Sequence, residues 1–156
     1  IHNSSVQEIH VPESNRVAEI RQCIQSIEKG RSTDIVFSVS KQLLFEVASI
    51  RALRALLEEK QIESYSIVCK YDVDGENELG DYNLIEKTYK IMSAVLGGAN
   101  AILSPFDGTE DARLTLNIHN VLDLESGMKN VMDPLAGAYY IEKLTGEIIR
   151  QVKEEN

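Results

Sequence analysis

Short runs of β-branched and apolar residues recur along this chain, each bounded by polar or turn-forming residues. Such runs occupy residues 35–40, 65–71 and 101–104, and their length and composition predict three β-strands. Residues 1–12 are polar and poorly patterned, so we predict no regular element there. The pattern therefore predicts strands only from residue 35 onward.

Before, between and after these runs, apolar residues recur at three- and four-residue steps, which is the period of an amphipathic helix. The helices predicted in this way cover residues 17–27, 43–60, 84–95, 111–122 and 139–154. Gly30 ends the first of them, and Gly97 and Gly98 end the third, because glycine readily takes the left-handed backbone conformation that closes a helix.

Alternation of strands with helices predicts βαβ units whose strands run parallel, which places the chain in the α/β class. The 156 residues are enough for a single domain with a real core and hardly enough for two. Two architectures fit this order of elements. One is a small three-layer α/β sandwich, and the other is part of a (β/α)₈ barrel, whose complete form takes about 250 residues.

Composition and charge narrow the possible partners. The formal net charge is −9 and the basic residues are scattered, so nucleic acid and anionic membrane surfaces are excluded as partners. Cys23 and Cys69 are far apart and lack the spacing of a metal or redox motif, which favours a reducing, cytoplasmic location. The chain begins with Ile1 rather than methionine, so we expect it to be a piece of a longer polypeptide.

The residues that could carry chemistry form no recognisable catalytic or metal motif. The three histidines, His2, His10 and His119, lack ligand spacing, and we interpret His119 as a surface or partly buried structural residue. An acidic loop resembles a calcium loop but lacks its terminal bidentate glutamate, so we interpret it as solvated. Its acidic residues are Asp72, Asp74, Glu76 and Glu78.

Three longer stretches carry a family resemblance. They are FEVASIRALRALLE from Phe45, YNLIEKTYKIMSAVLGGANAILSPFDG from Tyr82, and ARLTLNIHNVLDLESGMKNVMDPLAGAYYIEKLT from Ala112. In order and spacing they resemble the acyl-CoA-binding barrel of cobalamin-dependent methylmalonyl-CoA mutases, over residues 34–145. The most specific pieces are the two glycines after a helix, Pro-Phe-Asp after the last strand, and Asp-Pro-x-x-Gly-x-Tyr-Tyr.

The resemblance implies a fold. The family barrel is a TIM barrel through which the pantetheine chain of CoA threads, so this chain would be its C-terminal half, with the last three βα units and the closing helices. Residues 133–145 would leave the last barrel helices and pack back on the outside, with Tyr139 and Tyr140 structural rather than catalytic. The cobalamin-binding domain of the family, with its Asp-x-His-x-x-Gly motif, is absent, so residues 1–156 are expected to be one barrel domain.

Three departures from the family pattern fall at its polar site. The family's catalytic chain carries a His and a Gln, after the seventh barrel strand, where this chain has Val68 and Lys70. It carries a Glu where this chain has Gly108. A radical rearrangement needs a dry cavity with placed hydrogen-bond donors, while cobalamin supplies the difficult chemistry. The resemblance therefore implies the small, non-catalytic subunit, with no catalytic, cofactor-binding or metal residues of its own.

The implied partner is the catalytic large subunit, which isomerises methylmalonyl-CoA and succinyl-CoA with adenosylcobalamin bound in the parent complex. An alternative is a divergent acyl-CoA mutase barrel that still binds CoA and turns over. A half barrel has an open sheet with free edges, so we also expect self-association of this piece through that sheet.

Overall fold

The structure is a computed structural model that describes residues 7–11, 15–27, 32–71, 80–104 and 108–154. The acidic residues at positions 72–78 and His2 lie outside these ranges. The strands are β1 (Gln7–Val11), β2 (Thr33–Ser38), β3 (Tyr65–Lys70) and β4 (Ala101–Leu103). The helices are α1 (Arg16–Ser26), α2 (Leu43–Glu59), α3 (Gly80–Gly97), α4 (Gly108–Asn120) and α5 (Tyr139–Glu154). A π-helical turn, η1 (Val121–Glu125), and a 3₁₀ turn, η2 (Met128–Asn130), join α4 to α5.

The four strands form one parallel sheet in the order β1-β2-β3-β4, which is also their order in the sequence. The predicted α/β class and the three predicted parallel strands are confirmed. The prediction that residues 1–12 hold no regular element is wrong, because Gln7–Val11 pairs with Thr33–Phe37. Ile9 and Val11 alternate with Glu8 and His10, so only one face of this short strand is apolar, and the pattern was too brief to stand out.

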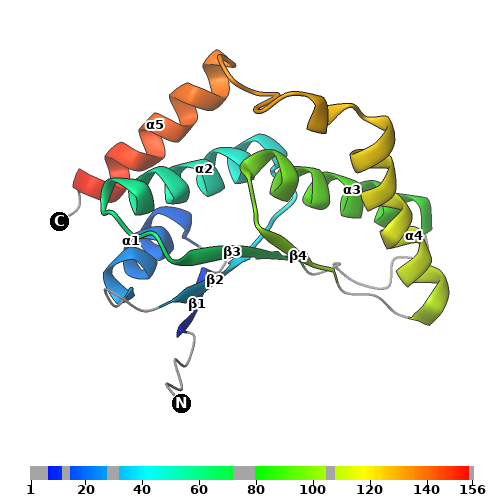
Figure 1. Cartoon of the computed structure of the whole chain (residues 1–156), viewed down its shortest axis with the longest axis horizontal. Coiled ribbons are helices and arrows are strands. Elements are labelled where there is room, and N and C mark those ends of the chain that lie inside the picture. Colours follow the sequence, from blue (N-terminus) through cyan, green and yellow to red (C-terminus); the bar gives the residue numbers. More distant parts are fainter. Residues whose placement is uncertain (1–6, 12–14, 28–31, 72–79, 105–107, 155–156) are drawn as a thin grey trace.

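Helices cover one face of the sheet only (Figure 1). α1, α2 and α3 form a layer directly on that face, and α5 lies outside them against α1 and α2. Successive right-handed crossovers in one direction place every connecting helix on the same side. The arrangement of the described helices is thus not a three-layer sandwich, in which both sheet faces are covered.

The core lies between the sheet and α2. Ile35, Phe37, Ile67 and Cys69 point to the helix side and are fully buried, in one cluster with the apolar stripe of α2. That stripe consists of Ile50, Leu53, Leu56 and Leu57. Burying each large aliphatic side chain contributes about 1.5–3 kcal/mol, so this layer supplies most of the drive for folding.

A buried ion pair lies at the carboxyl ends of β1 and β2. The Arg16 guanidinium donates to both carboxylate oxygens of Glu46, at 2.9 and 2.8 Å, and to the Ser38 carbonyl at 2.7 Å. The Ser40 hydroxyl donates to the same carboxylate at 2.6 Å, and the guanidinium lies 4.1 Å from the Phe37 ring centre. The side chains of the pair are 2% and 1% exposed, so water screens neither charge. The pair fixes the start of α1 to the start of α2.

Close packing of α2 and α3 depends on a glycine. A Cβ on Gly97 would lie 2.8 Å from Ile50 Cβ, so a larger residue would push the helices apart. Gly98 then has φ +85°, which confirms the predicted helix end. Arg51 Nε donates to the Leu96 carbonyl at 3.4 Å and Arg54 donates to the Gly98 carbonyl. These contacts satisfy carbonyls that the helix end leaves open.

The last helix attaches to the outside of the helix layer. The apolar side chains of Ile141, Ile148 and Val152 are buried, and Leu144 and Ile149 pack against the same core. Arg21 of α1 donates to the carbonyls of Val152 and Gln151, at 3.0 and 2.9 Å, and so ties down the carboxyl end of α5. After residue 133 the chain thus packs back against the helix layer through α5.

Candidate functional site

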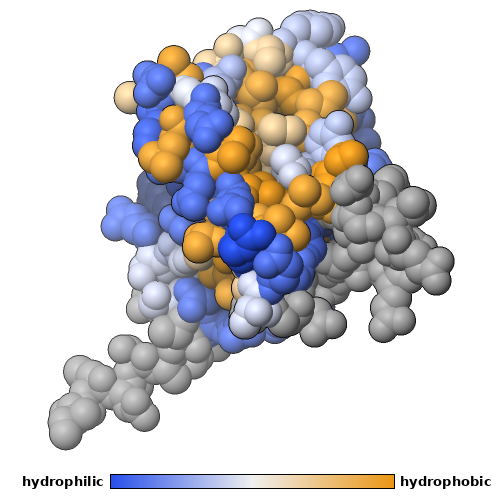
Figure 2. All heavy atoms as spheres, turned by 90° about the vertical axis from the view of Figure 1, so that its right-hand side faces the viewer, coloured by the Kyte–Doolittle hydropathy of each residue, from blue (hydrophilic) through white to orange (hydrophobic). Residues whose placement is uncertain are grey.

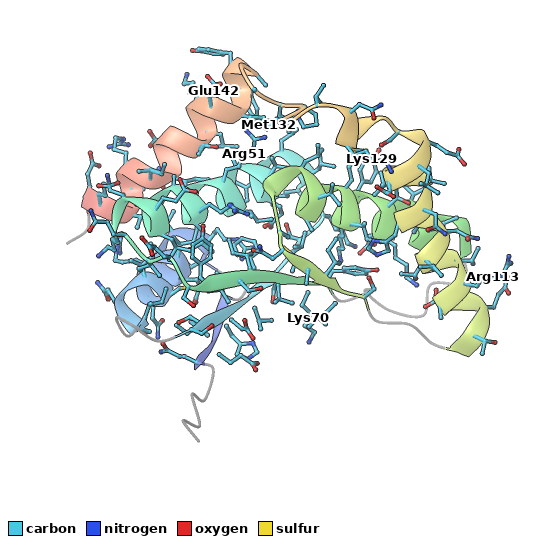
Figure 3. All side chains as sticks on the ribbon, viewed as in Figure 1. Arg51, Lys70, Arg113, Lys129, Met132 and Glu142 are labelled. Carbon is cyan, nitrogen blue, oxygen red and sulfur yellow. The ribbon has the colours of Figure 1, made fainter. Side chains whose placement is uncertain are left out.

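The sheet face opposite the helices carries two of the three residues at which the sequence departs from the family pattern that it resembles, Val68 and Lys70. Val68 pairs across the sheet with Val36 and Ala101, and Lys70 pairs with Ser38 and Leu103. Figure 3 shows Lys70 on the side of β3 that faces away from the helices. Val68 is half-buried and Lys70 is exposed. Both residues lie within β3, two positions apart and on the same face of the strand. The resemblance had placed them after the strand.

Much of the remainder of this uncovered face is small or polar. Glu8, Asp34 and Ser66 form one row across the strands, and His10 lies in the next row beside Val36. His10 Nε2 is 2.9 Å from Glu8, and both side chains are exposed. This face is therefore mixed, because an apolar row of Val36, Val68 and Ala101 crosses it and Leu103 is exposed beside Lys70. Gly108 begins α4, beyond the carboxyl end of β4.

A second candidate site is a groove on the helix side of the molecule. It has a volume of about 930 Å³ and lies between α2, the end of α3, α5 and the connection from α4 to α5 (residues 121–138). Figure 3 shows Arg51 of α2, Met132 of the connection and Glu142 of α5 around it. The apolar part of its lining comes from all of these elements. It includes Ala55, Val95, Leu96, Leu122, Met128, Val131 and Ile149.

Most charged groups of the groove are paired within the chain. Arg51 forms an ion pair with Asp133, and Lys129 Nζ lies 3.1 Å from Asp123. Hydrogen bonding to Arg51 holds the pKa of the Asp133 carboxyl below its usual range. A Glu142 carboxylate oxygen accepts from the Gly137 backbone at 2.8 Å. Three basic and four acidic side chains line the groove, so its charge is close to balanced.

Large apolar side chains are exposed on the connection and at the start of α5, and two of them, Val131 and Met132, line the groove. We call Leu124, Val131, Met132, Tyr139 and Tyr140 the apolar rim. Met132 is 104% exposed, Tyr139 75% and Tyr140 59%, so the rings of the two tyrosines are not packed into the core. Figure 2, which views the molecule from the α4 side, also shows an apolar patch between polar residues. Sequence reasoning interpreted Tyr139 and Tyr140 as structural residues, because the pattern of residues 131–140 does not report which apolar side chains stay exposed.

The titratable residues elsewhere support no catalytic centre within the described part of the chain. Burial raises the pKa of the free thiols of Cys23 and Cys69 to about 12, which keeps them protonated and unreactive. His119 is half-buried on α4, as predicted; its Nε2 is 3.5 Å from Ser104 Oγ, and burial lowers its pKa. Among the residues that the structure describes, no three histidine, cysteine, aspartate or glutamate side chains form a metal-binding group.

No described helix combines the length and apolar character needed to cross a lipid bilayer. Fold and surface together define a class: an α/β protein with a singly wound parallel sheet, one uncovered sheet face and an apolar groove on its helix side.

Comparison with known proteins places the chain within a family. A family model described as methylmalonyl-CoA mutase matches residues 73–155. The methylmalonyl-CoA mutase of Rhizobium meliloti is 33% identical over 129 residues, which cover 72% of this chain and 18% of that protein. Because the family model covers more than half of the chain, the chain belongs to the methylmalonyl-CoA mutase family.

Two further relatives are named as mutase subunits. The 2-hydroxyisobutanoyl-CoA mutase large subunit of Aquincola tertiaricarbonis is 37% identical over 79 residues, 46% of this chain and 14% of that protein. The methylmalonyl-CoA mutase small subunit of Streptomyces virginiae is 37% identical over 73 residues, 42% of this chain and 12% of that protein. The chain thus spans less than a fifth of the length of these relatives.

Proposed function

We propose that this chain is the C-terminal part of the acyl-CoA-binding barrel of a methylmalonyl-CoA mutase small subunit. In this proposal the subunit supports a catalytic large subunit and does not itself isomerise the acyl group. The proposal is supported by the family match and by the likeness to a small subunit. The observation that carries the proposal is that Val68 and Lys70, on the uncovered face of β3, stand where the resemblance expects a histidine and a glutamine.

The topology supports the barrel part of the proposal. Strands follow one another in sequence order, and helices cover one face, as in consecutive units of a (β/α)₈ barrel. The opposite face, with Val36, Val68 and Ala101 in one row, would then be the inner wall. Its carboxyl end is where barrel enzymes place their catalytic groups.

The side chains at that end support the non-catalytic part. Valine donates no hydrogen bond, so Val68 offers no group to orient a thioester where the family resemblance expects a histidine. Lys70 places a full positive charge where the resemblance expects a neutral amide, and Gly108 provides no carboxylate. A wall of this kind shapes a barrel without supplying the polar contacts that catalysis needs.

The residues present do not fit a site for adenosylcobalamin. Two histidines lie in the described part of the chain. His10 is paired with Glu8 on the sheet surface, and His119, on α4, faces Ser104. Neither stands in the Asp-x-His-x-x-Gly motif that the resemblance associates with this cofactor. In the proposal, the described residues of this chain hold no adenosylcobalamin and contribute no step through it.

Enzyme assays test the proposal. We expect the purified full-length subunit to show no turnover of methylmalonyl-CoA with adenosylcobalamin, and the catalytic subunit to be active once the two are mixed. Turnover by the subunit alone would show that it is a divergent catalytic mutase and refute the non-catalytic assignment. Failure of the two purified subunits to form a complex would refute the supporting role.

A further inference from the structure

A layer of polar side chains lies between α4 and the carboxyl ends of β3 and β4 (Figure 1). Tyr71, which follows β3, is buried, and so is Thr115 of α4. Lys87 of α3, also buried, forms an ion pair with Asp111 in the first turn of α4. Among the described residues of α4, Ile118 is the one large apolar side chain that is buried. Polar contacts therefore hold much of this helix in place.

Tyr71 lies at the centre of this polar layer. Burial raises the pKa of its phenol, while the side chain of Ser104 lowers it and the Asp111 carboxylate raises it, so both groups lie close to the hydroxyl. Ser104 Oγ in turn lies 3.5 Å from His119 Nε2. Asp111, Thr115 and His119 follow one another at four-residue steps and share one face of α4. Tyr71 therefore lies beneath that face.

Two hydroxyls of the polar layer are buried without a hydrogen bond. Within the described part of the chain, neither the Tyr71 hydroxyl nor the Thr115 hydroxyl has a partner in hydrogen-bonding geometry. A buried hydroxyl without a partner has lost its hydration and gained nothing in return, so closing α4 over the sheet costs free energy at both positions. Opening α4 returns both hydroxyls to water. The polar layer therefore holds α4 less firmly than the apolar core holds α2.

His119 makes the closure of α4 depend on pH. Its ring is half-buried, and burial lowers its pKa. In the polar layer it faces Ser104, and the two charged groups there, Lys87 and Asp111, are paired with each other. On its other side lies the groove, whose charged residues are Arg51, Arg54, Glu58, Asp123, Lys129, Asp133 and Glu142.

The sign of the effect follows from the burial of the His119 ring. A neutral ring fits the closed position, whereas a protonated ring is better solvated when α4 is open. As pH falls through the ordinary histidine pKa, the open form takes up the proton first. Closure then weakens until the pH lies below the lowered pKa of the closed form.

We propose that α4 is a pH-sensitive latch over the carboxyl ends of β3 and β4, which opens as a unit and opens more often in acid. Opening exposes Tyr71 and Ser104 to solvent and removes His119 from the lining of the groove. In the proposed barrel, this end of the sheet is where ligands bind, so the latch controls access to it. The latch needs no catalytic partner, and its test is independent of the proposed function.

The test is amide hydrogen exchange of the full-length protein, followed in α4 and α2 between about pH 5 and pH 8. Protection factors, which correct for the intrinsic effect of pH on exchange, give the opening equilibrium of each helix, and α2 serves as the internal reference. Tyr71→Phe and Thr115→Val each remove an unpartnered hydroxyl. His119→Gln keeps a neutral polar side chain that does not titrate. Tyr65→Phe, at the other end of β3, is the control.

We expect α4 to be less protected than α2 in the wild type, and its protection to fall in acid by at most about tenfold per pH unit. Tyr71→Phe and Thr115→Val should each raise the protection of α4 about fivefold or more, while Tyr65→Phe leaves it unchanged. His119→Gln should abolish the effect of acid. Equal protection of α4 and α2, or hydroxyl variants that fail to raise the protection of α4, would overturn the latch. An effect of acid that persists in His119→Gln would overturn its control by pH.

Discussion

Replacing Arg16 with methionine is expected to be among the most destabilising single substitutions in this chain. Methionine keeps the apolar contact with the Phe37 ring, where the guanidinium now lies 4.1 Å from the ring centre. It leaves the Glu46 carboxylate, 1% exposed, without its positive partner. Ser40 still donates its hydroxyl and its backbone N–H, at 2.6 and 3.2 Å, but these are neutral donors.

Removing one member of a buried ion pair costs about 3–5 kcal/mol, because the remaining charge is desolvated and unpaired. A domain of this size is stable by about 5–15 kcal/mol, so the loss is a large share of the total. Removing both charges together, as in Arg16→Met/Glu46→Leu, should recover most of this loss, since an apolar pair of similar volume avoids desolvation altogether.

The assay is urea-induced unfolding of the wild type, Arg16→Met, Glu46→Leu and the double variant. The free energies of unfolding give the coupling between the two sites. Two results would refute the reasoning. One is a loss below about 1 kcal/mol in Arg16→Met, the value of an exposed pair. The other is a double variant as unstable as the sum of the single losses, which would mean that the two charges do not interact.

Three further outcomes are expected. Gly97→Ala should destabilise the fold by about 1–3 kcal/mol in thermal unfolding through overpacking, whereas Gly146→Ala, where a Cβ meets nothing within 4 Å, should stabilise it by about 0.5–1 kcal/mol. Cys23 and Cys69 should resist a thiol reagent at pH 8 in the native state and react on unfolding; fast native reaction would contradict their burial. The Asp133 contact should contribute stability above the ordinary aspartate pKa and lose it as pH falls through the lowered native pKa, so an NMR titration of this carboxyl at its ordinary value would contradict the ion pair.

The periodic elements were predictable because their patterns report burial directly. The apolar residues around Ile35 and Ile67 in the core strands and the apolar stripe of the helix through Leu53 meet in the structure. β1 was missed because Ile9 and Val11 are its only core residues beside exposed polar neighbours. The π-helical turn after Asn120 could not be read either, since its residues continue the helical period.

The site was less predictable than the fold. The departure from the resembled family's pattern singled out Val68 and Lys70, and the structure adds that they share one face of a strand. The groove joins Arg51 to Asp133, which are 82 positions apart, and no local pattern connects them. Exposure of Met132 is likewise a property of packing, because the same apolar residue in the same sequence context could have been buried.

The order of the strands has a consequence for how the chain folds. Among the described residues, each strand pairs with its neighbour in the sequence, for example Thr33 with Tyr65, so each of these ladders closes after a single intervening helix. Units of this kind can add one after another as the chain leaves the ribosome, at a modest cost in loop entropy. α5 is different, because Arg21 meets the Val152 carbonyl across 131 positions. Contacts of such long sequence separation form late, so we expect docking of α5 to be the step that completes folding.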